Sequence, residues 1–167
     1  DALDTVREAL IASPQFPEAQ YRQVVLLAKK DDLRAALSIL KNLITAKPEF
    51  YLKSLIDPAL SHSRKEVIAL TDELFKHLYS QASDNIKNIK KNLAEHKEWF
   101  DRDDYEYKTA EKILRQTIKL FEGNSYFGLL DVVSYGLDIK DRLRSALKNR
   151  RRSIRKNINM LREVGDE

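Results

Sequence analysis

The residue types that carry out catalysis or bind metal ions are sparse in this chain. Its 167 residues include no cysteine, so disulfides, thiolate nucleophiles and sulfur-bound zinc are excluded. The three histidines, His62, His77 and His96, lie 15 and 19 residues apart, and no two share the i, i+4 spacing that places imidazoles around one metal ion. The sequence also lacks a glycine-rich loop that could cradle a phosphate. We therefore expect no metal, no cofactor and no enzymatic activity.

The charged residues with the clearest chemical potential form a basic run near the end of the chain. Residues 140–157 include nine lysines and arginines, against Asp141 as the one acidic residue. A stripe of this kind can bind the phosphates of nucleic acid or of anionic lipid. The candidate basic site consists of Arg144, Lys148, Arg150, Arg151, Arg152, Arg155 and Lys156.

Two other interpretations of the basic run stay open. It can be a solvated helix face, or it can pair with the acidic residues Asp101, Asp103, Asp104 and Glu106, which the expected helix lengths place nearby. The run contains no aromatic side chain that would stack on a base, and no known nucleic-acid-binding signature accompanies it. The sequence therefore favours solvated or internally paired charge over a phosphate site.

The basic run belongs to an expected helix about forty residues long, from Ser125 to Val164. This stretch contains no proline, and its apolar residues recur every three or four positions, which is the period of a buried helix face. The predicted inward positions are Tyr126, Leu130, Val133, Leu137, Leu143, Leu147, Ile154, Ile158 and Leu161.

Arg150 and Arg151 interrupt that apolar seam, and Ile154, Ile158 and Leu161 resume it. We expect these three residues to contact a partner, which is either another domain of the parent protein or a second copy of the chain, paired through residues 145–164. The alternative is a helix end that frays or continues into further sequence.

Two more helices are expected before it, over residues 64–100 and 105–121, and short turns join all three. Neighbouring helices joined in this way run antiparallel. Because the middle helix is the shortest, the last helix should draw level with the acidic turn near Arg142 to Lys148 and continue beyond it. The first helix is expected to bury Val67, Leu70, Leu74, Leu78, Ala82, Ile86, Ile89 and Leu93.

The beginning of the chain contains a repeated motif. Ser13-Pro14-Gln15-Phe16 recurs 34 residues later as Lys47-Pro48-Glu49-Phe50, and two helices are expected between the copies, over 18–28 and 33–45. Asp32 is placed to cap the second of these helices.

This unit resembles the tetratricopeptide repeat over residues 1–50, on the match of Ala36, Leu40, Leu43 and Pro48 to the family pattern. The first helix departs from that pattern, with Gln20, Gln23 and Val24 where an aromatic residue, a leucine and a glycine are usual. The resemblance implies a helical repeat with a groove for an extended peptide. The groove lining would then be Gln20, Gln23, Val24 and Leu27.

The expected fold class is all-α, with a tetratricopeptide-like helix pair in residues 1–62 and an elongated three-helix bundle of long helices in 63–167. The longest apolar run, Val24–Ala28, is far shorter than the roughly 18 residues of a membrane-spanning helix. No signal peptide is recognisable, so we expect a cytoplasmic protein. The chain begins with Asp1 rather than methionine, and we expect it to be a segment of a longer protein.

The expected function is that of a non-enzymatic helical scaffold or protein–protein interaction module. Its partner would be another protein or another domain of the parent chain. The alternative is electrostatic binding of nucleic acid or anionic membrane through residues 148–156.

Overall fold

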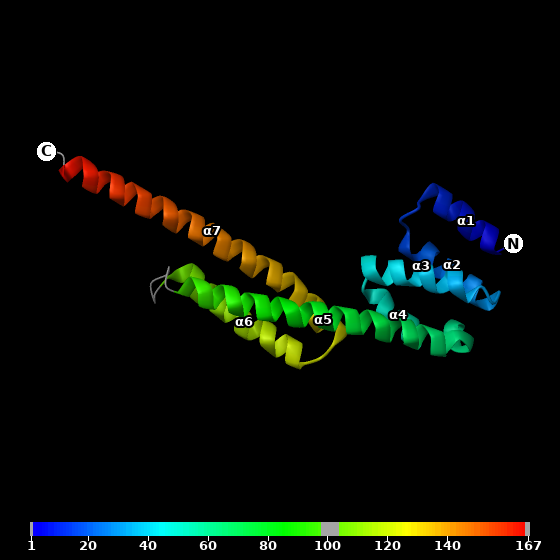
Figure 1. Cartoon of the computed structure of the whole chain (residues 1–167). Helices are drawn as coiled ribbons and strands as arrows, with labels where there is room; N and C mark the ends of the chain where they lie inside the picture. Colours follow the sequence, from blue (N-terminus) through cyan, green and yellow to red (C-terminus); the bar gives the residue numbers. More distant parts are fainter. Residues whose placement is uncertain (1, 98–103, 166–167) are drawn as a thin grey trace. The chain divides into compact units, whose positions relative to one another are not determined.

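Helices make up all the regular structure that the computed structural model describes, which covers residues 2–97 and 104–165 (Figure 1). The predicted all-α class is confirmed. Over the same residues, no helix is both long and apolar enough to cross a membrane. In chain order the elements are α1 (Ala2–Ala12), α2 (Pro17–Lys29), α3 (Leu33–Ala46), α4 (Glu49–Ile56), the short 3-10 helix η1 (Pro58–Ser63), α5 (Arg64–His96), α6 (Tyr105–Glu122) and α7 (Tyr126–Gly165).

The chain divides into two compact units, and the division falls inside α5. The first unit is Asp1–His77 and the second is Leu78–Glu167. The domain boundary expected from the sequence, between residues 62 and 63, falls in η1, just before α5 begins at Arg64, and it stays a prediction.

Local signals explain where the helices of the first unit begin and end. Pro17 opens α2, where its missing amide hydrogen costs nothing and its fixed φ suits a helix. Asp31 has a φ of 64° in the turn that follows α2. The Asp32 Oδ1 atom then accepts a hydrogen bond from the Ala35 backbone amide at 3.2 Å, so the predicted cap of α3 is confirmed.

In the first unit α2 packs against α3, and the first turns of α5 also contribute buried side chains. Leu40 and Ile44 of α3 and Val67 of α5 are almost completely buried. At the surface, Lys41 Nζ donates a hydrogen bond to Glu73 Oε1 at 2.8 Å, which links α3 to α5 and lowers the pKa of the Glu73 carboxyl. Burial of apolar area therefore holds this unit together, and the exposed ion pair adds little.

The two copies of the repeated motif lie in different surroundings. Phe16, in the first copy, is 48% exposed, whereas Phe50, in the second copy, is 2% exposed. Phe50 packs against Tyr21 of α2 with ring centroids 5.2 Å apart, and the Lys53 ammonium lies over both rings. The two copies therefore share a sequence motif but are not equally buried. The resemblance to the tetratricopeptide repeat stays a prediction.

A hydrogen bond from Tyr21 fixes the segment that leads into α5. The Tyr21 hydroxyl donates to Asp57 Oδ2 at 2.8 Å, while Asp57 Oδ1 accepts from the Ala59 backbone amide at 2.8 Å and starts η1. Burial, and then the hydrogen bond to Asp57, raise the pKa of the Tyr21 phenol well above its ordinary value.

In the second unit, side chains from three helices form one apolar cluster. Ile89 and Leu93 come from α5, Ala110 from α6, and Ile139 and Leu143 from α7. The inward spacing of three and four residues on each helix brings these side chains together. The Asp104 carboxylate starts α6 by accepting hydrogen bonds from the backbone amides of residues 106 and 107 at 3.0 and 3.1 Å.

The buried face of α7 differs from the predicted one. Leu137, which was expected to point inward, is 60% exposed, and Tyr126, Leu130 and Val133 are only partly buried. The physical reason is that the buried side of α7 includes Gly136, and hydropathy does not mark a glycine as a core residue. A Cβ at Gly136 would lie only 3.0–3.2 Å from the Asn85 side chain of α5, so the close approach of α5 selects this register. The residues that α7 buries are Gly128, Leu129, Val132, Gly136, Ile139 and Leu143.

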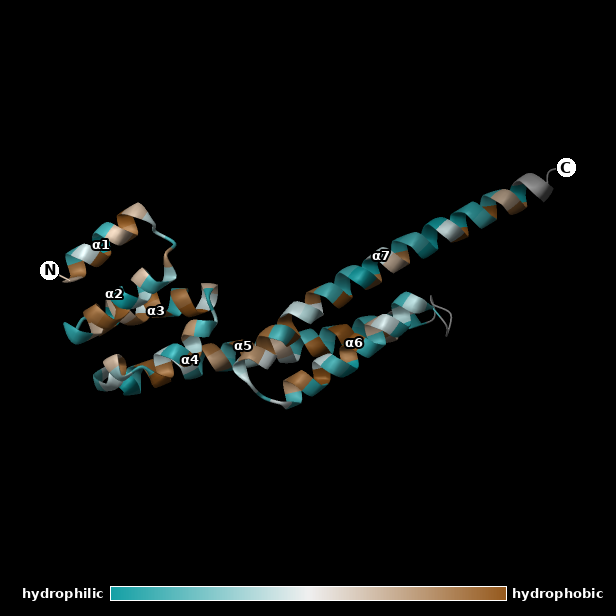
Figure 2. Cartoon of the chain, turned by 180° about the vertical axis from the view of Figure 1, so that it is seen from behind, coloured by the Kyte–Doolittle hydropathy of each residue, from teal (hydrophilic) through white to brown (hydrophobic). Residues whose placement is uncertain are grey.

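Burial on α7 stops soon after Leu143. Ala146 and Leu147 are half-buried, and every residue from 148 to 162 is exposed. Figure 1 shows α7 continuing past the described ends of α5 and α6, and Figure 2 shows this part as mostly hydrophilic. We call residues 148–162 the arm of α7.

The register of α7 can be tested by comparing two truncations in the same helix. Ile139→Ala removes a fully buried side chain and should lower the free energy of unfolding by about 2–5 kcal/mol. Leu137→Ala removes an exposed one and should change it by about 0.5 kcal/mol or less. Urea unfolding followed by circular dichroism measures both, and equal costs would contradict the observed register.

The Tyr21–Asp57 hydrogen bond should appear in the pH dependence of stability. Tyr21→Phe should lower the free energy of unfolding by about 1 kcal/mol at neutral pH. Because the pKa of Tyr21 is raised in the folded chain, the native state keeps the proton that the unfolded state loses above about pH 10. Stability should therefore fall as pH rises above that value, and less steeply in Tyr21→Phe. Melting curves recorded at neutral and alkaline pH compare the two proteins, and identical slopes would contradict the assignment.

Candidate partner-binding groove

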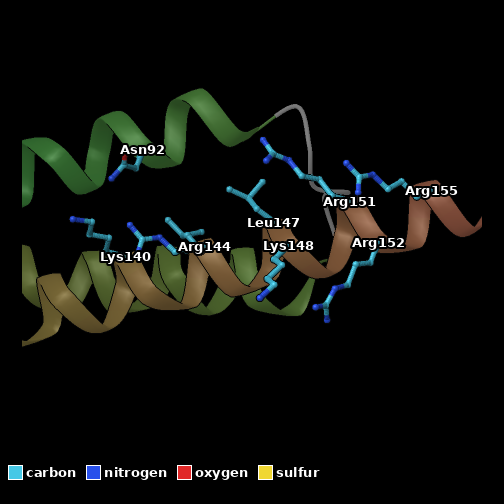
Figure 3. Close-up of a pocket in the computed structure, with 9 residues that line it drawn as sticks. Asn92, Lys140, Arg144, Leu147, Lys148, Arg151, Arg152 and Arg155 are labelled. Carbon is cyan, nitrogen blue, oxygen red and sulfur yellow. The ribbon is translucent and has the colours of Figure 1, made fainter.

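A groove of about 490 Å³ runs along α7 at the end of the apolar cluster (Figure 3). Asn92 of α5 contributes to it from the other side. The α7 residues form two adjacent rows with steps of four, 140/144/148/152 and 143/147/151/155, so they cover one broad side of the helix. They are Lys140, Leu143, Arg144, Leu147, Lys148, Arg151, Arg152 and Arg155.

The floor of the groove is apolar and its outer edge is basic. Leu143 is buried and Leu147 is half-buried, which leaves leucine surface open at the point where the cluster ends. Figure 3 shows Leu147 and Arg151 extending from α7 toward the side of α5, and Lys148 and Arg152 pointing away from it. A ligand here would meet apolar surface and positive charge at the same time.

A second cavity, of about 360 Å³, adjoins the first and shares Asn92 and Lys140 with it. Three of its six α5 residues are asparagines at helical spacing, the other three are one apolar, one basic and one acidic residue, and its α7 side contains the exposed Leu137. The remaining lining residues are Asn85, Asn88, Ile89, Lys91, Glu95, Gly136 and Leu137. The two cavities follow one another along α7 on the side of α5, and we call them together the α5–α7 groove.

Close contact between the two helices fixes the inner end of the α5–α7 groove. The Asn85 side-chain amide donates a hydrogen bond to the Val133 carbonyl of α7 at 3.4 Å, over the backbone of Gly136. A larger residue at 136 would have to displace Asn85. The groove is therefore closed at its inner end, where α5 and α7 touch, and it widens where α7 extends past the apolar cluster.

The structure brings five of the seven predicted basic residues into this groove. They are Arg144, Lys148, Arg151, Arg152 and Arg155. Arg150 and Lys156 are exposed on the arm but are not part of the lining. The predicted basic site is thus spread over more than one side of the helix.

The structure tests only part of the predicted pairing between the basic run and the acidic residues at 101–106. Asp101 and Asp103 lie outside the described residues. Arg142 donates from Nε to Asp138 Oδ2 at 2.9 Å, one turn back on α7. That hydrogen bond is the largest cause of the raised pKa of Arg142, and the nearby charge of Glu106 at the start of α6 adds to it. Arg142 of α7 therefore lies close enough to the start of α6 to feel the charge of Glu106, and the pairing of the basic run with the acidic turn stays a prediction.

The exposed apolar residues of the arm continue the seam of α7 with a change of phase. From Leu129 to Leu143 the seam advances by three and four residues in alternation, and the next two steps, to Leu147 and Arg151, are both four. An extra four-residue step of this kind is a stutter, which locally unwinds a coiled-coil pattern. Alternation then resumes through Ile154, Ile158 and Leu161, all of which are exposed.

The groove expected from the repeat resemblance is only partly formed by the predicted residues. Gln20 and Gln23 line a cavity of about 290 Å³ together with Leu10, Pro14, Ile39 and Asn42. Gln20 Nε2 donates to the Pro14 carbonyl at 2.8 Å, so this amide is already engaged. Val24 is 1% exposed and belongs to the core instead, because it faces the packed side of α2, and Leu27 is not in the lining.

Sequence reasoning missed the α5 side of the α5–α7 groove and five α7 residues of its lining, which are Gly136, Leu137, Lys140, Leu143 and Leu147. Asn85, Asn88 and Asn92 recur at steps of three and four, which marks a polar stripe on one side of a helix. That stripe borders the buried residues Ile86, Ile89 and Leu93. The asparagine stripe was the one sign in the sequence that a neutral surface lies beside the buried residues of α5.

Comparisons with models of protein families, with curated proteins and with solved structures found no match to this chain. In residues 2–97 and 104–165, no three acidic or histidine side chains are grouped so that they could hold a metal ion. The chemistry that the α5–α7 groove offers is an apolar floor, a basic edge on α7 and an amide edge on α5.

Proposed function

We propose that this chain is a non-enzymatic helical module that binds a protein partner along α7, through the α5–α7 groove and the arm. The observation that carries the proposal is the coincidence of open apolar surface and basic charge on one side of the helix. Protein interfaces combine an apolar centre with a polar rim in this way. The partner is either another protein or another domain of the parent chain.

The apolar component favours a protein over a polyanion. Leu147, Ile154 and Ile158 contribute nothing to the binding of phosphates, which depends on positive charge and the release of counterions. Residues 140–162 contain no aromatic side chain on which a base could stack. Apolar side chains at helical spacing are instead the anchors by which one helix recognises another.

A second candidate function is electrostatic binding of nucleic acid or of anionic membrane through residues 148–156. The observation that favours it is the excess of nine basic residues over one acidic residue in 140–157. Clustered charge of one sign on a helix attracts polyanions at a distance.

Binding of polyanions measured at physiological salt distinguishes the two candidate functions. Under the proposed function, DNA, RNA and anionic vesicles should bind no more tightly than about 10 µM at physiological salt, which is the range of non-specific attraction. Replacing Arg150, Arg151 and Arg152 together by glutamate should then remove only this weak binding. Nanomolar binding that the triple variant loses would instead support the polyanion candidate and contradict the proposal.

Site-specific crosslinking tests the proposed surface in extracts of the cells that make the protein. A photoreactive amino acid in place of Ile154, on the apolar side of the arm, should give one discrete protein adduct that resists nuclease. The same replacement of Asn149, which is exposed on another side of the same helix, is the matched control and should give about tenfold less adduct. Gel analysis and mass spectrometry measure both. Equal adducts at the two positions, no adduct, or an adduct removed by nuclease would each contradict the proposal.

A further inference from the structure

The α5–α7 groove is long rather than round. Its two adjoining cavities extend along α7 from Gly136 and Leu137 to Arg155. Leu137 and Arg155 are 18 residues apart, which corresponds to about 27 Å along a helix. An occupant that fills this length is rod-shaped, and an α-helix of about five turns has these dimensions.

Apolar contacts are available along the whole rod. Leu137 lies at the inner end of the groove, Leu147 in its middle, and Ile154 just beyond it on the arm. Leu147 and Ile154 are seven residues apart and lie in one row of the helix, whereas Leu137 lies about 80° around the helix from that row. A second helix can pack an apolar ridge against the Leu147 and Ile154 row and contact Leu137 at the inner end of the groove. An extended peptide would instead need unpaired backbone groups to bind to, and helices α5 and α7 satisfy theirs internally.

The two edges of the groove differ in charge. Lys140, Arg144, Lys148, Arg152 and Arg155 line the α7 edge. On the α5 edge, Asn88 and Asn92 are neutral, Lys91 is basic, and Glu95 is acidic and forms an ion pair with Lys91 at 3.8 Å. The basic excess therefore lies on one edge only.

We infer that the α5–α7 groove seats an amphipathic α-helix of the partner, about 18 residues long, that carries acidic residues on only one of its two flanks. The acidic flank faces the α7 edge, and a neutral polar flank faces the asparagines of α5. This inference rests on the proposed function, because it names the class of protein segment that the groove binds.

A second copy of the chain does not fit this description. Residues 140–157 carry nine basic residues and one acidic residue, so pairing two arms through residues 145–164 would oppose like charges. The homodimer through residues 145–164 stays a prediction of the sequence, and the mass of the chain in solution tests it against an acidic partner.

Two synthetic peptides of identical composition test the inference. Each has 18 residues, with leucines at the same positions on one side of the helix. One carries all its glutamates on one flank of the leucines and all its glutamines on the other, whereas the second carries equal numbers of both on the two flanks. Fluorescence anisotropy with the full chain at physiological salt should give about tenfold tighter binding of the one-flank peptide. Either peptide can dock in both directions, so the comparison depends only on whether all the acidic residues can face the α7 edge.

Matched variants of the chain locate the binding. Lys148→Glu changes a residue of the α7 edge, whereas Lys156→Glu makes the same charge change outside the lining. We expect about tenfold weaker binding of the preferred peptide to the first, and less than about threefold to the second. Leu137→Gln removes exposed apolar surface without disturbing the core and should weaken binding about fivefold.

Other occupants of the groove would give different results in these binding experiments. Equal affinity for the two isomers, or equal effects of Lys148→Glu and Lys156→Glu, would overturn the inference and leave only general attraction of negative charge. Displacement of the peptide by RNA or anionic vesicles at physiological salt would overturn it in favour of a polyanion. A doubled mass of the chain alone, abolished by Leu137→Gln, would assign the groove to a second copy.

The crosslinking experiment separates this inference from the proposed function. A protein adduct at position 154 together with no binding of either peptide would leave the protein-binding function standing and reject the acidic helix. Failure to form any protein adduct would reject the function itself.

Discussion

The second unit depends on the burial of one side of α7 against α5 and α6. Ile139 and Leu143 meet Ile89, Leu93 and Ala110 in a single cluster, so three helices share one apolar centre. Burying side chains of this size is worth a few kcal/mol each and fixes the rotation of α7 about its axis. That rotation in turn decides which residues line the groove. The site is therefore a consequence of the core.

The close approach at Gly136 gives this rotation its precision. Asn85 reaches over the glycine to the Val133 carbonyl, which brings α5 near to α7 and places Asn88 and Asn92 along the groove. A partly buried polar contact of this kind is satisfied in only one register, whereas apolar side chains tolerate small shifts. The amide stripe thus sets the register of the helices and supplies the neutral edge of the binding surface.

Helix positions could be predicted from the sequence because their causes are local. Pro17 and Asp32 set the beginnings of α2 and α3, and Asp104 sets the beginning of α6, each through groups within a few residues. The inward side of α7 could not be predicted in the same way, because an exposed leucine and a buried glycine reverse the hydropathy at positions 136 and 137. Only the approach of Asn85, about fifty residues away in the chain, decides between the registers.

The stutter between Leu143 and Ile154 constrains the geometry of anything that follows α7. Four apolar or arginine positions, Leu143, Leu147, Arg151 and Ile154, divide eleven residues into three steps, so the average step is slightly longer than one turn of an α-helix. A helix that packs along this stretch therefore cannot follow the left-handed twist of a heptad coiled coil. An eleven-residue period instead favours a slight right-handed twist, which any helical neighbour of α7 has to match.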